Sequence, residues 1–166
     1  FVEVTDPYNP VLVGELPSDK RDAAGNVELS VWRDMKVYAD HAYIVADSAP
    51  GHGMQVFDLT QLLTYTHPVV FEPTARYQRI SSAHNIVINE QTGFAFIVGA
   101  RGSATGDDCG SGLHMIDLSD PADPQFAGCY SEYGTSRWGG AFSNDAHCVV
   151  YEEQDEDWQS AEICVN

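Results

Sequence analysis

One pattern occurs three times in the chain: an alternation of apolar and other residues that ends in an aspartate. The copies are "VEVTDPYNP" at 2–10, "MQVFDLT" at 54–60 and "LHMIDLSDP" at 113–121. A period of two is typical of a β-strand with one buried face. The aspartates are Asp6, Asp58 and Asp117, and we interpret them as turn residues, because a carboxylate here accepts backbone N–H bonds. The recurrence indicates a repeat fold.

A second element lies between these copies. Each intervening segment reads as an alternating strand, a polar turn and another alternating strand, which predicts a β-hairpin. The three hairpins occupy 34–47, 83–99 and 146–165. In chain order the unit is therefore a hairpin, a loop, a strand that ends in Asp, a turn and a last strand. Four short strands in a repeat of about 50 residues are typical of a β-propeller blade.

We therefore predict an all-β fold, a β-propeller of four-stranded antiparallel blades that takes up the whole chain, 1–166. A blade end is expected at 1–17, whole blades at 30–80 and 83–131, and a partial blade at 146–165. These make about three blades, whereas closed propellers usually have about 4–8. Because an open arc would expose edge strands, we expect other blades or chains to complete the ring. The chain opens directly on a strand, so we also expect it to be part of a longer or processed protein.

The charge of the chain excludes some partners. The formal net charge is −17, and the lysines are Lys20 and Lys36 alone. Binding to nucleic acid depends on Lys and Arg that displace counterions from phosphates. We therefore expect neither nucleic acid nor an anionic membrane surface as a partner. No apolar run approaches the roughly 18 residues of a membrane-spanning helix.

Five stretches carry a resemblance to a known family. They are "VWRDMKVYADHAYIVAD" (31–47), "GHGMQVFDLTQL" (51–62), "SAHNIVINEQTGFAF" (82–96), "GLHMIDLSDPADPQFAGCYS" (112–131) and "DAHCVVYEEQDEDWQSAEIC" (145–164). In the order of these stretches and in their residues, the chain resembles the LVIVD-repeat proteins, in particular the bacterial choice-of-anchor B proteins. The resemblance implies a β-propeller that is secreted or displayed on the cell surface. It implies no particular activity.

The four cysteines favour two local disulfides. Cys148 and Cys164 lie on the two strands of one predicted hairpin, and Cys109 and Cys129 belong to one predicted blade. Of the three possible connectivities, 109 with 129 and 148 with 164 is the simplest. Disulfides indicate an oxidising compartment, so we expect an extracellular, cell-surface or periplasmic location. The alternative is four reduced thiols in a cytosolic protein.

Two histidines occupy the same place in successive repeats. His84 and His147 begin the first strand of their repeats, and Asp34 or Met35 takes the equivalent place in the preceding repeat. The first strand is innermost in a propeller, so these side chains could converge and bind a transition metal. The alternative is that each imidazole bonds a neighbouring backbone group and tightens the packing between blades.

Two loops contain candidate ligand-binding residues. Asp107 and Asp108 are candidate calcium ligands, because hard cations prefer carboxylate oxygens; the alternative is a solvated acidic turn. Arg137 and Trp138 are candidate anchors for a surface ligand, because such residues are frequent in binding loops. The alternative is a connector between blades with Trp138 in the core.

The function that we favour from the sequence is an extracellular or cell-surface binding or scaffold module. No nucleophile motif and no phosphate-binding loop occur in the chain. One alternative is a metal-dependent enzyme whose axial site contains Asp34, His84 and His147. Another is a structural subunit of a surface assembly. The cofactor that these hypotheses imply is a divalent metal, either calcium or a transition metal.

Overall fold

The computed structural model describes residues 1–19, 32–64, 66, 68–102, 109–132 and 142–166. Strands are the main regular secondary structure of these residues, so the prediction of a mainly β fold is confirmed. The helices among them are three short 3₁₀ turns, Leu59–Thr64 (η1), Cys109–Ser111 (η2) and Glu156–Trp158 (η3). Within the described ranges no helix has the length and apolar character needed to cross a membrane.

The first four-stranded sheet is antiparallel, with its strands in chain order. It contains β4 (Arg33–Tyr38), β5 (His41–Ala46), β6 (Met54–Asp58) and β8 (Ala75–Tyr77). Ala39 and Asp40 join the first two strands and both have positive φ, 46° and 59°. Two-residue hairpins favour this backbone, because its twist matches that of the strands.

The second four-stranded sheet repeats the arrangement of the first. Its strands are β9 (Asn85–Asn89), β10 (Phe94–Val98), β11 (Leu113–Asp117) and β12 (Gln125–Tyr130). The register shifts between Met115 and Ile116, which indicates a β-bulge in the pairing with β12. The two sheets lie within the stretches predicted as blades, and each has the predicted four antiparallel strands.

Smaller strand pairs lie at both ends of the chain. The C-terminal hairpin, β13 (His147–Val150) and β14 (Glu162–Val165), forms as expected from the sequence. Near the N-terminus, β1 (Val2–Glu3) pairs antiparallel with β2 (Val11–Leu12). A further pair, β3 (Gly14–Glu15) with β7 (Val69–Val70), is parallel, and the sequence did not predict it.

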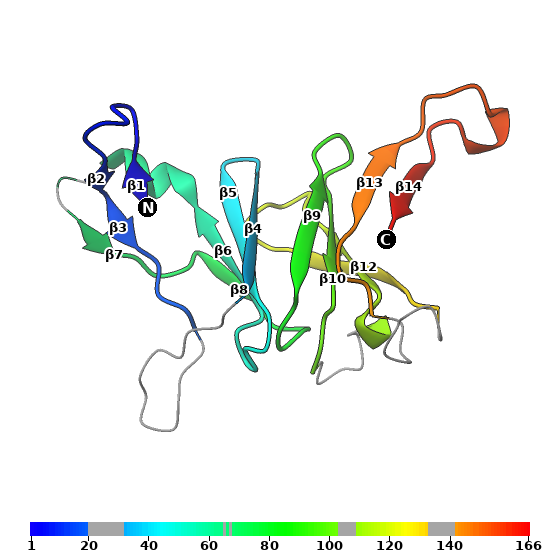
Figure 1. Ribbon diagram of the computed structural model, residues 1–166, viewed down its shortest axis with the longest axis horizontal. Coiled ribbons are helices and arrows are strands. Elements are labelled where there is room, and N and C mark those ends of the chain that lie inside the picture. The colour runs from blue at the N-terminus through cyan, green and yellow to red at the C-terminus, as the bar shows by residue number, and fades with distance from the viewer. Residues whose placement is uncertain (20–31, 65, 67, 103–108, 133–141) are drawn as a thin grey trace.

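The sheets follow one another along the long axis of the molecule (Figure 1). The strands β1, β2, β3 and β7 lie at one end, and the hairpin of β13 and β14 lies at the other. Between them β9 contacts both β4 and β13. The first strands of three successive repeats are therefore neighbours, as the innermost strands of a propeller would be. Closure into a ring stays a prediction.

Three apolar clusters occupy the layers between these sheets. The alternation of the strands explains how one strand serves two clusters. In β10, Ala95 and Ile97 contribute to the cluster shared with the first sheet, whereas Phe96 and Val98 contribute to the one beside the C-terminal hairpin. At the other end Phe57 lies in a third cluster, with its ring 4.7 Å from that of Phe1. Each four-stranded sheet is thus packed on both faces.

Candidate functional site

The clearest polar cluster at a sheet boundary contains His84, one of the histidines that the sequence singled out. His84 precedes β9, and its Nδ1 lies 2.9 Å from Oδ2 of Asp47, which follows β5 of the preceding sheet. Its Nε2 lies 3.2 Å from the amide nitrogen of Asn144, which leads into β13. A carboxylate accepts and an amide nitrogen donates, so these contacts fit a neutral imidazole protonated on Nδ1. One side chain thereby links three successive repeats.

The carboxylate of Asp47 is held in its ionised form. Its side chain is only 8% exposed, and burial alone would favour the protonated acid. Hydrogen bonds from His84 and from the N–H of Ser48 oppose this effect, as does the charge of Arg101 at 4.0 Å, and together they lower the pKa of Asp47. The Arg101 guanidinium also lies 5.2 Å from the centre of the Phe142 ring. The site therefore combines a buried carboxylate, an imidazole and a half-exposed cation.

His147 lacks the surroundings of its repeat equivalent. It is an exposed residue at the start of β13, opposite Val165. The reason lies in the second strand of the repeat before each histidine. "AYIVAD" at 42–47 comes before His84, and the aligned segment "AFIVGA" at 95–100 comes before His147. Asp47 corresponds to Ala100, so the second repeat offers His147 no carboxylate at the place from which Asp47 of the first repeat contacts His84.

Asp34 also connects two sheets. Its carboxylate forms an ion pair with Lys36 at 2.7 Å and accepts a hydrogen bond from the backbone N–H of Ile86 in β9. Asp34, His84 and His147 therefore have different partners. Among the described residues, the one group of three metal-ligating side chains whose donor atoms lie within 4.8 Å of one another consists of Cys109, His114 and Cys129. The proposed axial metal site stays a prediction.

Both predicted disulfides are present. Cys109 pairs with Cys129 inside the second sheet region, and Cys148 pairs with Cys164 across the C-terminal hairpin. Cys148 and Cys164 are direct cross-strand partners in the register of β13 and β14. The two bonds are consistent with the expected oxidising compartment.

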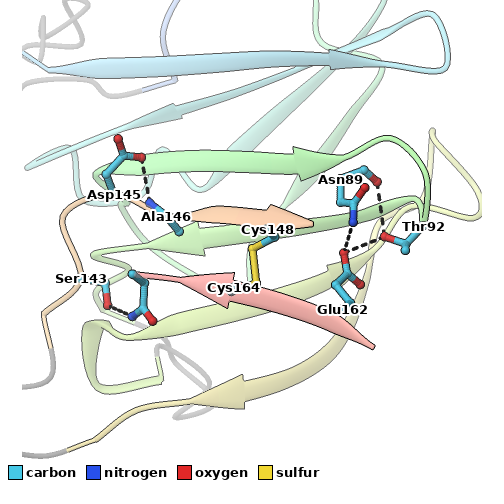
Figure 2. Close-up of a disulfide and its surroundings, with 9 residues drawn as sticks. Asn89, Thr92, Ser143, Asp145, Ala146, Cys148, Glu162 and Cys164 are labelled. Carbon is cyan, nitrogen blue, oxygen red and sulfur yellow. Dashed lines mark hydrogen bonds between the residues drawn. A yellow bond between two sulfur atoms is a disulfide. The ribbon is translucent and has the colours of Figure 1, made fainter. Parts of the chain in front are cut away.

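The C-terminal hairpin is attached to the second sheet at three levels (Figure 2). At one end of the hairpin the Glu162 carboxylate accepts hydrogen bonds from Asn89 at 2.6 Å and Thr92 at 2.8 Å. In its middle, Cys148 belongs to the apolar cluster that contains Phe96. At the other end Ser143 accepts a hydrogen bond from Asn166 at 2.6 Å and donates its own backbone N–H to the carbonyl of Ser111, which precedes β11. These contacts fix the hairpin on the face of the sheet.

A groove of about 710 Å³ lies between this hairpin and the outer strands of the second sheet. Its lining is mainly apolar and includes Phe96, Leu113, Met115, Tyr130, Trp158 and Ile163. Within the described part of the chain β14 pairs with β13 alone, whereas its counterpart β10 pairs on both edges. As far as the described strands go, the outer edge of β14 is thus unpaired, and the groove lies beside it.

Four predicted ligand residues lie outside the described residues. They are Asp107, Asp108, Arg137 and Trp138. Their assignments to calcium and to a surface ligand stay predictions.

The sequence analysis missed His114 and Tyr77. His114 is fully buried in β11, with Nε2 2.7 Å from the Tyr77 hydroxyl of the first sheet and Nδ1 3.4 Å from the sulfur of Cys109. The signal was a polar residue inside the alternating strand "LHMID". Its neighbours could not be deduced, because they come from two different elements.

Comparisons with protein-family models and with curated proteins give no match to this chain. The resemblance to the LVIVD-repeat proteins therefore rests on the stretches quoted above.

Proposed function

We propose that the chain is an extracellular or cell-surface binding and scaffold module of the LVIVD-repeat type, and that it forms part of a larger β-propeller. Two four-stranded antiparallel sheets in chain order support this function, as do the neighbouring first strands β4, β9 and β13. Two disulfides support the compartment.

The observation that carries the proposal is that the third repeat is incomplete among the described residues. It contributes the hairpin of β13 and β14, whose edge is unpaired within the described residues, beside an apolar groove. In the second repeat the same positions are completed by β11 and β12. Two further antiparallel strands would extend the edge of β14 by backbone hydrogen bonds and would cover the groove with apolar side chains.

These strands would come from a later part of the same protein or from another chain. In both cases the recognition consists of strand addition together with burial of Met115, Tyr130 and Trp158. Main-chain pairing supplies affinity, and the side-chain groove supplies the register. The chain as a whole has a net charge of −17, so the rest of its surface would face solvent or cationic ligands.

The proposal is tested by isolating the native particle that contains this chain from its source. Native mass spectrometry and electron microscopy should show a ring with more blades than this chain supplies. The variant Tyr130→Glu should weaken the assembly, because the half-exposed ring lines the groove. Tyr8→Glu is the matched control, since Tyr8 is 91% exposed and lies outside the groove. A lone 18.2 kDa monomer as the native particle would contradict the proposal.

A further inference from the structure

The Cys109–Cys129 disulfide differs from the other disulfide because a buried histidine contacts it. Nδ1 of His114 lies 3.4 Å from Sγ of Cys109, and the ligand atoms of Cys109, His114 and Cys129 all lie within 4.8 Å of one another. His114 is also the direct cross-strand partner of Cys129, so the two side chains share one face of the sheet. Within the described ranges no such group includes Cys148 or Cys164.

We infer that, once this disulfide is reduced, Cys109, Cys129 and His114 form a binding site for a soft divalent cation such as zinc. Two thiolates and an imidazole are a ligand set that zinc prefers. In a tetrahedral site with Zn–S of about 2.3 Å and Zn–N of about 2.0 Å, the sulfur and nitrogen ligands lie about 3.5 Å apart. The pair of His114 and Cys109 already has nearly this spacing.

The contact between Tyr77 and His114 orients the imidazole for this role. The Tyr77 hydroxyl lies 2.7 Å from Nε2, and a hydroxyl oxygen can accept a hydrogen bond from Nε2–H. Nδ1 then presents its lone pair on the side of the sulfurs. Metal-bound histidines typically have such a partner on the second ring nitrogen, which fixes the tautomer and the ring plane.

The Cys109–Cys129 disulfide must be reduced before the site can bind a cation. A dithiol reductant transfers two electrons and two protons to the protein, so that the bond between the sulfurs breaks and both cysteines become thiols, while the reductant forms a cyclic disulfide. A divalent cation then displaces the two thiol protons. Cys129 is an exposed residue, which gives the reductant and the cation a route to the buried ligands.

The experiment is an anaerobic titration with Co²⁺ after reduction with a dithiol and removal of the reductant. We expect one cobalt per chain, with a sulfur-to-cobalt charge-transfer band and the visible bands of tetrahedral cobalt. The double variant Cys148→Ser, Cys164→Ser should retain these bands. The double variant Cys109→Ser, Cys129→Ser leaves the same number of thiols and should lose them.

Two single variants test the histidine and its orientation. His114→Gln introduces the residue that stands at the equivalent place in the first sheet, where Gln55 is buried, and should weaken cobalt binding by at least about tenfold. Tyr77→Phe should weaken it by about 10–100-fold. Tyr43→Phe is the control for the second variant, because Tyr43 is also a buried tyrosine of the first sheet but its hydroxyl donates to the carbonyl of Pro121 and not to His114.

Circular dichroism in each titration shows whether reduction or substitution unfolds the chain. If reduction alone unfolds it, cobalt should restore the β spectrum together with the bands in the wild type. The inference is overturned if the wild type shows no stoichiometric cobalt band, if the Cys109→Ser, Cys129→Ser variant shows the same band, or if His114→Gln binds cobalt as tightly as the wild type.

Discussion

Asp47 and His84 lie 2.9 Å apart across the boundary between the two four-stranded sheets. One residue follows the second strand of its sheet, and the other precedes the first strand of the next. The contact therefore joins two repeats through side chains, beside the backbone hydrogen bond that Ala83 donates to Ala46.

Replacing Asp47 with alanine should lower the free energy of unfolding by about 1–3 kcal/mol. The substitution leaves the Nδ1–H of His84 and the N–H of Ser48 without their acceptor. Asp145→Ala is the matched control, because Asp145 likewise accepts the N–H of the following residue but is exposed; it should change stability by less than about 0.5 kcal/mol. Urea unfolding of the three proteins measures the difference, and equal values would disprove the contribution of Asp47.

The contribution of Asp47 should also depend on pH. Its pKa is lower in the folded state than the ordinary value of 3.8, so the unfolded chain binds a proton more readily. The stabilisation is complete above the unfolded pKa and is lost as the pH falls from about 5 through 3.8 and below. The stability difference between the wild type and Asp47→Ala should therefore shrink in acid, whereas a difference that is constant from pH 7 to pH 3 would contradict this.

His52 should make the protein less stable in mild acid. It is fully buried, and burial lowers its pKa below the ordinary value of 6.5. The unfolded chain then takes up the proton first, so stability is complete above about pH 6.5 and declines below it, by at most about 1.4 kcal/mol per pH unit. His52→Gln should reduce this decline between pH 7.5 and 5, and the exposed His147→Gln should not. An equal decline in all three proteins would assign it to other groups.

Removal of the hairpin disulfide should cost about 3 kcal/mol. Cys148 and Cys164 are separated by 16 residues, and closure of a loop of this length restricts the unfolded chain by about that amount. The double variant Cys148→Ala, Cys164→Ala is compared with the wild type by thermal and urea unfolding without reductant. Peptide mapping under non-reducing conditions provides the check on connectivity, and free thiols in the wild type would refute it.

Gly53 should tolerate no side chain. It has a φ of +64°, and a Cβ built there would lie 2.5 Å from the carbonyl oxygen of Tyr77. Gly53→Ala should therefore destabilise the protein by more than about 2 kcal/mol, from backbone strain together with the clash. Gly51→Ala separates the two effects, since Gly51 also has positive φ but open space around it. If both variants lose the same stability, the clash contributes nothing.

The hypothesis of an axial metal site is tested by measuring the metal content of the purified protein. A transition metal held by Asp34, His84 and His147 should be present in stoichiometric amount in protein purified without chelator. The double variant His84→Ala, His147→Ala should lose it, as elemental analysis would show. Wild-type protein without such a metal would leave the binding and scaffold function as the remaining proposal.

Local sequence patterns predicted the elements whose partners are close in the chain. Alternation gave the hairpins, and the positions of Cys148 and Cys164 on one hairpin gave their pairing. The parallel pair of β3 and β7 was missed because two-residue strands far apart in sequence leave no periodic signal. The contact of Tyr77 with His114 was missed for a related reason, since the phenol belongs to one sheet and the imidazole to the next. Only the packing of the sheets brings them together.

The replacement of Asp47 by Ala100 at the corresponding place of the next repeat makes the two sheet boundaries chemically distinct. Two sheets with similar backbones are therefore not interchangeable modules. A shuffled protein in which the second sheet preceded the first would take Asp47 away from the boundary that His84 faces, because this carboxylate belongs to the sheet that would then follow. The linear order of the repeats is thus specified by side chains at the boundaries, and recombination between repeats within the gene would be penalised at the level of folding even where every strand is preserved.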